Sequence, residues 1–163
     1  MLLLFLKTSY VIYMRFLFIL LYFFFIQAHG HQFEKNDIII KHPILKINSN
    51  SAKVGAGYFK ILNNSQKEVY LLGVDSKISE KQEIHEVIEE NNVFKMRPIT
   101  KGLLIKPGTE LIFKSQSFHI MFFKFIKVLK ADQMVAAKLN FGKNLVIPIE
   151  FKVITKSDNH NHH

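Results

Sequence analysis

The 163-residue sequence contains no cysteine. The chain therefore cannot form a disulfide, a thiolate metal site, a thioredoxin-like redox pair or a cysteine nucleophile. A blue-copper electron-transfer site is excluded too, because such a site needs a cysteine thiolate among its copper ligands. The chain also has no need of disulfides, since a domain of this length buries roughly two thirds of its unfolded surface.

Long apolar runs are scarce and lie near the N-terminus. The run Phe16–Ile26 follows Arg15, and Ala28 and Gly30 occupy positions −3 and −1 of a cut after Gly30. This layout is typical of a secretory signal peptide. The run is short for a membrane span, which needs about 20 residues. We therefore predict a signal peptide over residues 1–30 and an exported, periplasmic protein.

Two features of this N-terminal segment stay open. Residues 1–13 are themselves apolar around Lys7, so an uncleaved signal that anchors the chain in the inner membrane is an alternative. Such a signal would be the chain's contact with the membrane. Met14 is an alternative start, because Met14 and Arg15 would begin a normal positively charged signal region.

Acidic residues are outnumbered by basic ones. The sequence has 22 Lys+Arg and 13 Asp+Glu, and of these only Lys7 and Arg15 lie in residues 1–30. The mature chain keeps 20 basic and 13 acidic residues, which is a net charge of +7. A basic exported domain suits acidic partner domains or anionic lipid, although a lysine-rich surface explains the charge more simply. No basic block or arginine–aromatic pattern indicates a nucleic-acid partner.

Short β-rich runs separated by turn residues follow one another through the mature chain. This regular punctuation predicts an all-β sandwich or barrel, which we expect to be one domain over residues 31–155. The polar residues 156–163 are predicted to be a disordered, His-rich tail. The predicted strands span residues 37–47, 53–62, 69–74, 82–88, 93–99, 110–114, 118–125, 134–141 and 145–154.

Residues 79–91 fit either a helix or a strand. Ser79 and Gln82 have the spacing of a helix capping box, and several apolar residues that follow have helical spacing. The same residues also fit the first strand of a hairpin. The pattern alone does not decide between the two.

The hairpin alternative makes a definite prediction of register. If residues 89–92 are a four-residue loop, Glu86 pairs with Lys95 across the two strands. His85 then lies directly opposite Met96, with Cβ atoms about 5 Å apart. Hairpin geometry would thus bring one histidine and one methionine together.

A second histidine–methionine pair lies in the predicted strand 118–125. Side chains two residues apart on a strand point to the same face. His119 and Met121 should therefore lie side by side, with Phe123 and Phe125 further along the same face. For an isolated H-x-M sequence, a core histidine and a gap-filling methionine are the simpler interpretation.

The two pairs together offer two imidazoles and two thioethers. Thioethers select Cu(I) over hard cations, and imidazole also suits copper. Zinc prefers imidazole, thiolate or carboxylate ligands, so two thioethers argue against a zinc site. A ligand set without thiolate favours a protein that holds copper over one that cycles its oxidation state.

The spacing and the surrounding sequence resemble the periplasmic copper chaperones of the PCu(A)C type. That family has a histidine, ten residues, a methionine, about 21 or 22 residues and then H-x-M. Here ten residues separate His85 from Met96, and 22 residues separate Met96 from His119, which begins H-I-M. The resemblance covers about residues 38–154 and includes GAGYFKILNN (55–64), EIHE (83–86), KMRPI (95–99), GLLIKPG (102–108) and FHIMFF (118–123).

The resemblance implies a cupredoxin-like Greek-key β-sandwich that binds one Cu(I) at a surface site through these four side chains. It implies a monomeric carrier, not an enzyme, that delivers copper toward cytochrome c oxidase. The implied partners are the copper-site subunit of that oxidase and Sco-type proteins. Two positions depart from the family pattern: Val87 stands where many members have a further methionine, and Ile44 stands where a tryptophan often follows H-P.

Other sites and functions stay open. His160, His162 and His163 are a candidate second site, because imidazole without thioether accepts Cu(II) well, but a solvated tail is an equal alternative. An exported β-sandwich adhesion or assembly module, with the histidines and methionines in its core, is the alternative function. A zinc hydrolase would lack a third good zinc ligand and has only Glu83 and Glu86 as nearby general bases.

Overall fold

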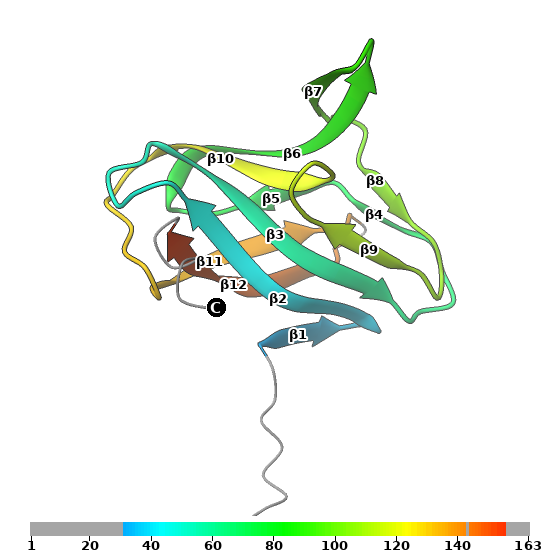
Figure 1. Cartoon of the computed structure of the whole chain (residues 1–163). Helices are drawn as coiled ribbons and strands as arrows, with labels where there is room; N and C mark the ends of the chain where they lie inside the picture. Colours follow the sequence, from blue (N-terminus) through cyan, green and yellow to red (C-terminus); the bar gives the residue numbers. More distant parts are fainter. Residues whose placement is uncertain (1–30, 143, 156–163) are drawn as a thin grey trace, which may run out of the picture. The chain divides into compact units, whose positions relative to one another are not determined.

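The computed structural model describes residues 31–142 and 144–155. The predicted signal peptide and the candidate second site at His160, His162 and His163 lie outside the described residues. The described residues form strands and turns and contain no helix (Figure 1). Within residues 31–142 and 144–155, therefore, no helix is long and apolar enough to cross a membrane.

Twelve strands follow one another in the described part of the chain, so the all-β prediction is confirmed. They are β1 (Gln32–Lys35), β2 (Ile38–Ile47), β3 (Val54–Asn63), β4 (Val69–Leu71), β5 (Gly73–Asp75), β6 (Ser79–Glu90), β7 (Val93–Pro98), β8 (Leu103–Ile105), β9 (Glu110–Phe113), β10 (His119–Phe125), β11 (Met134–Asn140) and β12 (Val146–Thr155).

Ten of these strands form one sheet. Its order is β5-β11-β12-β2-β3-β10-β6-β7, with β1 paired to β2 and β9 paired to β3. β12 and β2 run parallel, whereas the other paired strands of the described chain are antiparallel. β4 and β8 form a separate two-stranded sheet. In Figure 1 the β11–β12 pair lies behind β2 and β3.

The hydrophobic core lies between the two halves of the large sheet. Phe151 of β12 contacts Phe59 of β3 and Phe122 of β10 edge to face, with ring centroids 5.8 and 5.6 Å apart. All three rings are buried, and this arrangement is favourable for aromatic pairs. Because Phe122 points into the core, its neighbours Met121 and Phe123 point to the opposite, outer face of the sheet.

The ambiguous segment 79–91 is strand β6 and not a helix. Ser79 is buried and does not cap a helix. The Gln82 side chain instead donates hydrogen bonds to the Ser79 carbonyl (2.9 Å) and to the Ser76 carbonyl (3.1 Å). β6 pairs with β10 on one side and with β7 on the other, so sheet pairing on both edges outweighs the local helical pattern.

Three strand predictions differ from the structure. The predicted strand 69–74 is two strands, β4 and β5, which separate at Leu72 and pair with β8 and β11 respectively. β1 and β8 lie where no strand was predicted. β1 has four residues and no buried side chain, and β8 has only three residues, all apolar, so neither is long enough to show the alternation that predicts a strand.

Candidate metal site

The two candidate histidine ligands face each other on neighbouring strands. His85 of β6 and His119 of β10 are directly paired in the antiparallel register. Their ring centroids lie 5.8 Å apart and their ring planes make an angle of 55°. The two residues are only 9% and 4% exposed. The structure thus brings together two imidazoles that are 34 residues apart in the sequence.

Met121 lies on the same outer face, two residues beyond His119. It pairs with Glu83 of β6 and with Ala56 of β3, and it is partly buried. Phe123 follows on this face, with its ring centroid 6.0 Å from that of His85. The alternation predicted for His119, Met121 and Phe123 therefore agrees with the strand register.

The prediction that Phe125 shares this face is wrong. Phe125 is buried in the core, where its ring stacks on Phe122 with centroids 6.4 Å apart. Lys124, between Phe123 and Phe125, has a φ of +54°. This left-handed residue breaks the regular alternation and turns Phe125 inward.

The predicted register of the β6–β7 hairpin is also wrong. The loop has two residues, Asn91 and Asn92, both with positive φ (54° and 62°), as a type I′ hairpin turn requires. Glu90 therefore pairs with Val93, and both strands are longer than a four-residue loop would allow. The register differs from the prediction by two residues.

Met96 consequently lies opposite Val87, and Pro98 lies opposite His85. Because the difference is two residues, His85 and Met96 still share one face of the hairpin and are diagonal neighbours, typically about 7–8 Å apart. Met96 is 60% exposed. The expectation of a surface site therefore fits Met96, whereas both imidazoles are more covered than a surface site implies.

In place of the predicted charge pair between Glu86 and Lys95, the hairpin has two ion pairs to Glu90. The Glu90 carboxylate accepts hydrogen bonds from Lys95 and from Arg97, both of β7. These contacts hold the two hairpin strands together near the loop. All six residues of β7 are exposed, and within the described sheet β7 pairs with β6 alone.

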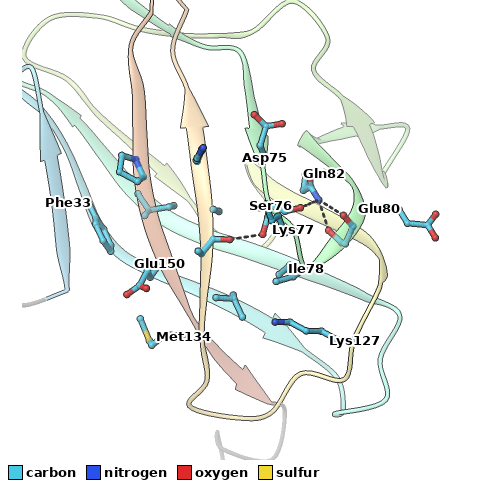
Figure 2. Close-up of a pocket in the computed structure, with 17 residues that line it drawn as sticks. Phe33, Asp75, Ser76, Lys77, Ile78, Glu80, Gln82, Lys127, Met134 and Glu150 are labelled. Carbon is cyan, nitrogen blue, oxygen red and sulfur yellow. Dashed lines mark hydrogen bonds between the residues drawn. The ribbon is translucent and has the colours of Figure 1, made fainter.

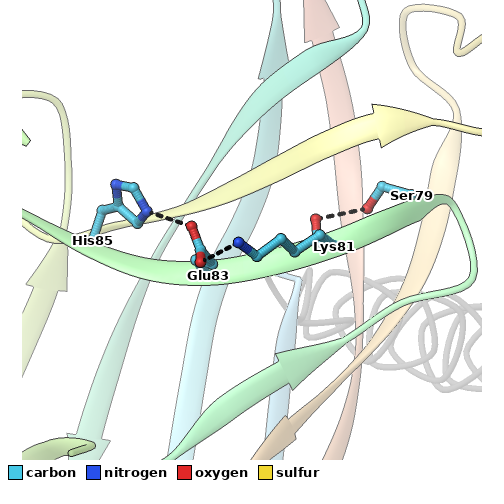
Figure 3. A network of polar contacts seen from close by, with 4 residues as sticks. All are labelled: Ser79, Lys81, Glu83 and His85. Atoms are coloured by element: carbon cyan, nitrogen blue, oxygen red, sulfur yellow. Dashed lines mark hydrogen bonds and ion pairs between the residues drawn. The ribbon is translucent and has the colours of Figure 1, made fainter. Parts of the chain in front are cut away.

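A chain of polar contacts runs along the outer face of β6 (Figure 3). Nε2 of His85 lies 3.0 Å from Oε2 of Glu83, and Nζ of Lys81 lies 2.7 Å from Oε1 of the same carboxylate. The hydrogen bond from Lys81, followed by the one from His85, holds the pKa of Glu83 below its ordinary value. Glu83 is therefore a charged acceptor beside the histidine pair.

The other histidine has a different polar neighbour. Nδ1 of His119 lies 3.0 Å from the Ser117 carbonyl oxygen. The Tyr58 ring on β3 completes this side of the site, with its centroid 6.5 Å from that of His119. Burial raises the pKa of Tyr58, and a hydrogen bond with Ser115 partly offsets this effect.

One ring nitrogen has no hydrogen-bond partner. Nδ1 of His85 is the one buried side-chain nitrogen or oxygen in the described residues that lacks a partner. Buried polar atoms are nearly always paired, and an unpaired one in a native fold calls for an explanation such as a bound ion. A lone pair on this nitrogen could serve as a metal ligand, which makes the histidine pair chemically suited to copper.

The remaining candidate ligands on this face are the thioethers of Met96 and Met121. In the described residues, no three side chains of His, Cys, Asp or Glu come together as a possible metal site. Sequence reasoning assigns no role to Ser117 and Tyr58, and it names Glu83 only as a candidate general base of the alternative zinc hydrolase. Glu83 could have been found from the two-residue alternation that places it on the same face of β6 as His85.

A groove lies elsewhere on the described part of the molecule (Figure 2). It has a volume of about 710 Å³ and contains none of the four candidate ligands. Its walls come from β11, β12 and the segment that connects β5 to β6, together with Phe33 of β1 and Gln82 of β6. Met134 lines this groove and is 40% exposed, so it is an exposed methionine outside the candidate site.

One model of a known protein family matches most of the chain. The LpqE-like family model, whose description is a lipoprotein of the LpqE type, matches residues 38–153. This chain belongs to the LpqE-like family. No curated protein matches this LpqE-like chain significantly.

Solved structures of PCuAC domains share the fold of this LpqE-like protein. The apo PCuAC domain from PmoF1 and the copper-bound PCuAC domain from PmoF2 both align with a TM-score of 0.64 and 17% identity. Each alignment covers 77% of this chain, with 99% of the PmoF1 domain and 98% of the PmoF2 domain. The CuI-DR1885 protein from Deinococcus radiodurans aligns with a TM-score of 0.57 and 16% identity over 80% of this chain and 85% of its own. The predicted cupredoxin-like fold and the resemblance to the PCu(A)C type are confirmed.

Proposed function

We propose that this LpqE-like protein is an exported copper carrier. It binds one Cu(I) through His85, Met96, His119 and Met121. The observation that carries the proposal is the direct pairing of His85 and His119 across two neighbouring strands, with a buried and unpaired ring nitrogen on His85. Met121 lies on the same face, level with Glu83, and Met96 lies on that face of the hairpin, opposite Val87 on the other side of His85.

The comparisons support copper as the cargo. One PCuAC domain of the same fold is described as copper-bound, and the DR1885 protein is described in its CuI state. The donor set of this chain agrees with the second description, because thioethers favour Cu(I) over harder cations. We therefore take Cu(I) as the oxidation state held between His85, His119 and the two methionines.

The arrangement suits a protein that transfers its copper to another protein. The imidazoles are covered, whereas Met96 is 60% exposed on a strand that pairs only with β6 within the described sheet. An incoming protein could replace this exposed thioether first, while the buried imidazoles still hold the ion. The proposed recipients are the copper-site subunit of cytochrome c oxidase, together with Sco-type proteins, in the periplasm.

An anaerobic competition titration of Cu(I) against a chromophoric chelator tests the copper site. The purified protein should bind one Cu(I), and the variant His85→Ala/His119→Ala should lose this binding. Transfer is tested by mixing the loaded protein with the soluble copper-binding domain of the oxidase subunit, with or without a Sco-type protein. A wild-type protein that binds no Cu(I) would contradict the proposal.

A further inference from the structure

The two imidazoles have different polar surroundings, although they face each other. Nε2 of His85 lies 3.0 Å from the Glu83 carboxylate, and its Nδ1 is buried without a partner. In His119 the roles are reversed, because Nδ1 lies 3.0 Å from a main-chain carbonyl, that of Ser117. Each ring thus uses a different nitrogen for its contact with the protein.

The chemistry of the acceptors fixes the proton on each ring. An ionised carboxylate and a carbonyl oxygen can only accept hydrogen bonds. In the neutral ring, Nε2 of His85 must therefore donate to Glu83, which leaves a lone pair on its Nδ1. By the same argument Nδ1 of His119 donates to Ser117, which leaves a lone pair on its Nε2. A metal bonds to the nitrogen that carries the lone pair.

We propose that Glu83 is a positioning residue that presents His85 to copper through Nδ1, while the Ser117 carbonyl presents His119 through Nε2. This inference rests on the proposed function. Lys81 takes part in the arrangement, because its ammonium group lies 2.7 Å from the other oxygen of the Glu83 carboxylate and holds it in place.

A carboxylate behind a ligating histidine has two physical effects. It fixes the ring orientation and the tautomer, and it makes the ligating nitrogen more basic. Loss of such a partner typically lowers metal affinity by about 10- to 100-fold. Glu83 therefore contributes to copper affinity without touching the metal.

The tautomers can be measured in the metal-free protein. Two-bond ¹H–¹⁵N correlation spectra of the ¹⁵N-labelled protein at about pH 8, where imidazole is generally neutral, distinguish a protonated from an unprotonated ring nitrogen. We expect His85 to be protonated at Nε2 and His119 to be protonated at Nδ1. On addition of Cu(I), the ¹⁵N signals of His85 Nδ1 and His119 Nε2 should shift most.

Substitutions at two acids of β6 distinguish a positioning role of Glu83 from a general effect on the fold. Glu83→Ala should give His85 a mixture of tautomers and raise the Kd for Cu(I) by about 10- to 100-fold. Glu86→Ala is the matched control, because Glu86 is the next acid on β6 and points to the opposite face. It should leave both the tautomer and the Kd close to those of the wild type.

A rescue experiment tests whether a hydrogen-bond acceptor at position 83 is what orients the His85 ring. Lys81→Ala removes the one ammonium group that contacts Glu83 among the described residues. In a Lys81→Ala background, Glu83→Gln keeps an oxygen that accepts from His85, and it should restore the single tautomer and most of the affinity that Glu83→Ala loses. If Gln and Ala behave alike in this background, Glu83 does not position the ring.

Two further results would overturn the proposal: metal-free His85 protonated at Nδ1, or Cu(I) shifting its Nε2 signal and not its Nδ1 signal. If the proposed copper-binding function itself is wrong, the experiments give a different result. In that case the wild type binds no Cu(I), while the tautomers of the metal-free rings still show whether Glu83 and Ser117 set them.

Discussion

Three methionines in the described strands differ in what surrounds them. Met96 and Met121 share the face of the histidine pair, whereas Met134 lies in the groove on β11. Met96 and Met134 are both exposed, at 60% and 40%. Exposure alone therefore does not distinguish a ligand from a surface side chain, but position relative to His85 and His119 does.

We expect Met96→Ala and Met121→Ala each to weaken Cu(I) binding by about tenfold or more, which corresponds to about 1.4 kcal/mol or more. The reason is the loss of one of two thioether ligands. Met134→Ala is the control and should leave the affinity unchanged. Competition titrations measure all three values. Equal effects at the three positions would contradict the assignment of the methionines.

Gly57 on β3 shows how the core supports the site strand. Gly57 is paired with Ile120 of β10. A Cβ atom at position 57 would lie 3.0 Å from the Phe122 ring and 3.1 Å from the Phe151 ring. The absence of a side chain thus lets two core rings pack beneath the strand that carries His119.

We expect Gly57→Ala to lower the free energy of unfolding by about 1–3 kcal/mol, because the added methyl group overpacks these rings. Gly73→Ala is the matched control, since a Cβ atom there meets no atom within 4 Å. It should change stability by less than about 0.5 kcal/mol. Urea unfolding of the two variants gives both values, and equal losses would show that the rings can move aside.

At the scale of elements, the β6–β7 hairpin shows what the sequence could and could not predict. The hairpin alternative, with residues 89–92 between its strands, follows from the pattern of polar and apolar residues. The loop length does not, because Asn91 and Asn92 lack the glycine that most strongly marks a two-residue turn. A change of two residues in register keeps every side chain on its face, so the pattern fits both loops equally well.

Strand β7 of the hairpin should open independently of the rest of the sheet. β7 is exposed along its whole length and pairs only with β6 among the described strands, and such elements have low local stability. Asn92→Ile places a β-branched residue at positive φ, which costs about 1–2 kcal/mol. We expect faster hydrogen exchange in β7 and weaker Cu(I) binding, with little change in Tm.

The conservative variant at the same position provides the control for the hairpin. Asn92→Gly suits a positive φ and should keep slow exchange in β7 and wild-type affinity for Cu(I). If Asn92→Ile also keeps wild-type affinity although β7 exchanges faster, Met96 does not depend on the hairpin, and its role as a ligand would be in doubt.

For the whole molecule, the sequence predicts the class of fold but not the order of the strands. The strand periodicity of β2, β3, β10 and β12 follows from alternating apolar residues. The pairing of β12 with β2 does not, because it joins segments about a hundred residues apart in the chain. The pairing of His85 with His119 cannot be predicted from the sequence pattern either. Residue type and spacing indicate both ligands, but it is the pairing of β6 with β10 that places them face to face.

Copper binding by the whole protein should depend on pH. An imidazole must be deprotonated to bind a metal, so binding releases protons wherever the free ligands are protonated. With two histidine ligands and two thioethers that do not titrate, the affinity for Cu(I) should fall toward pH 5 with a limiting slope of about two protons per copper. Competition titrations between pH 5 and 7 test this, and a constant affinity would mean that neither histidine is a ligand.

The last prediction concerns the C-terminal residues and the oxidation state of copper. His160, His162 and His163 follow β12, whose final residue is Thr155, and imidazoles without thioether accept Cu(II) well. We expect the whole chain to bind a second copper as Cu(II), and truncation after Thr155 to remove this binding. The Cu(I) site should stay intact, because truncation there leaves every strand of the described residues complete.

Cu(II) titration followed by electron paramagnetic resonance measures the second site in both forms. Replacement of the three C-terminal histidines by asparagine is the matched control, because it keeps the length of the chain and removes only the imidazoles. It should remove the Cu(II) signal as truncation does. If the truncated chain gives the same Cu(II) spectrum and stoichiometry as the whole chain, these histidines hold no copper, because the remaining residues then account for all the bound Cu(II).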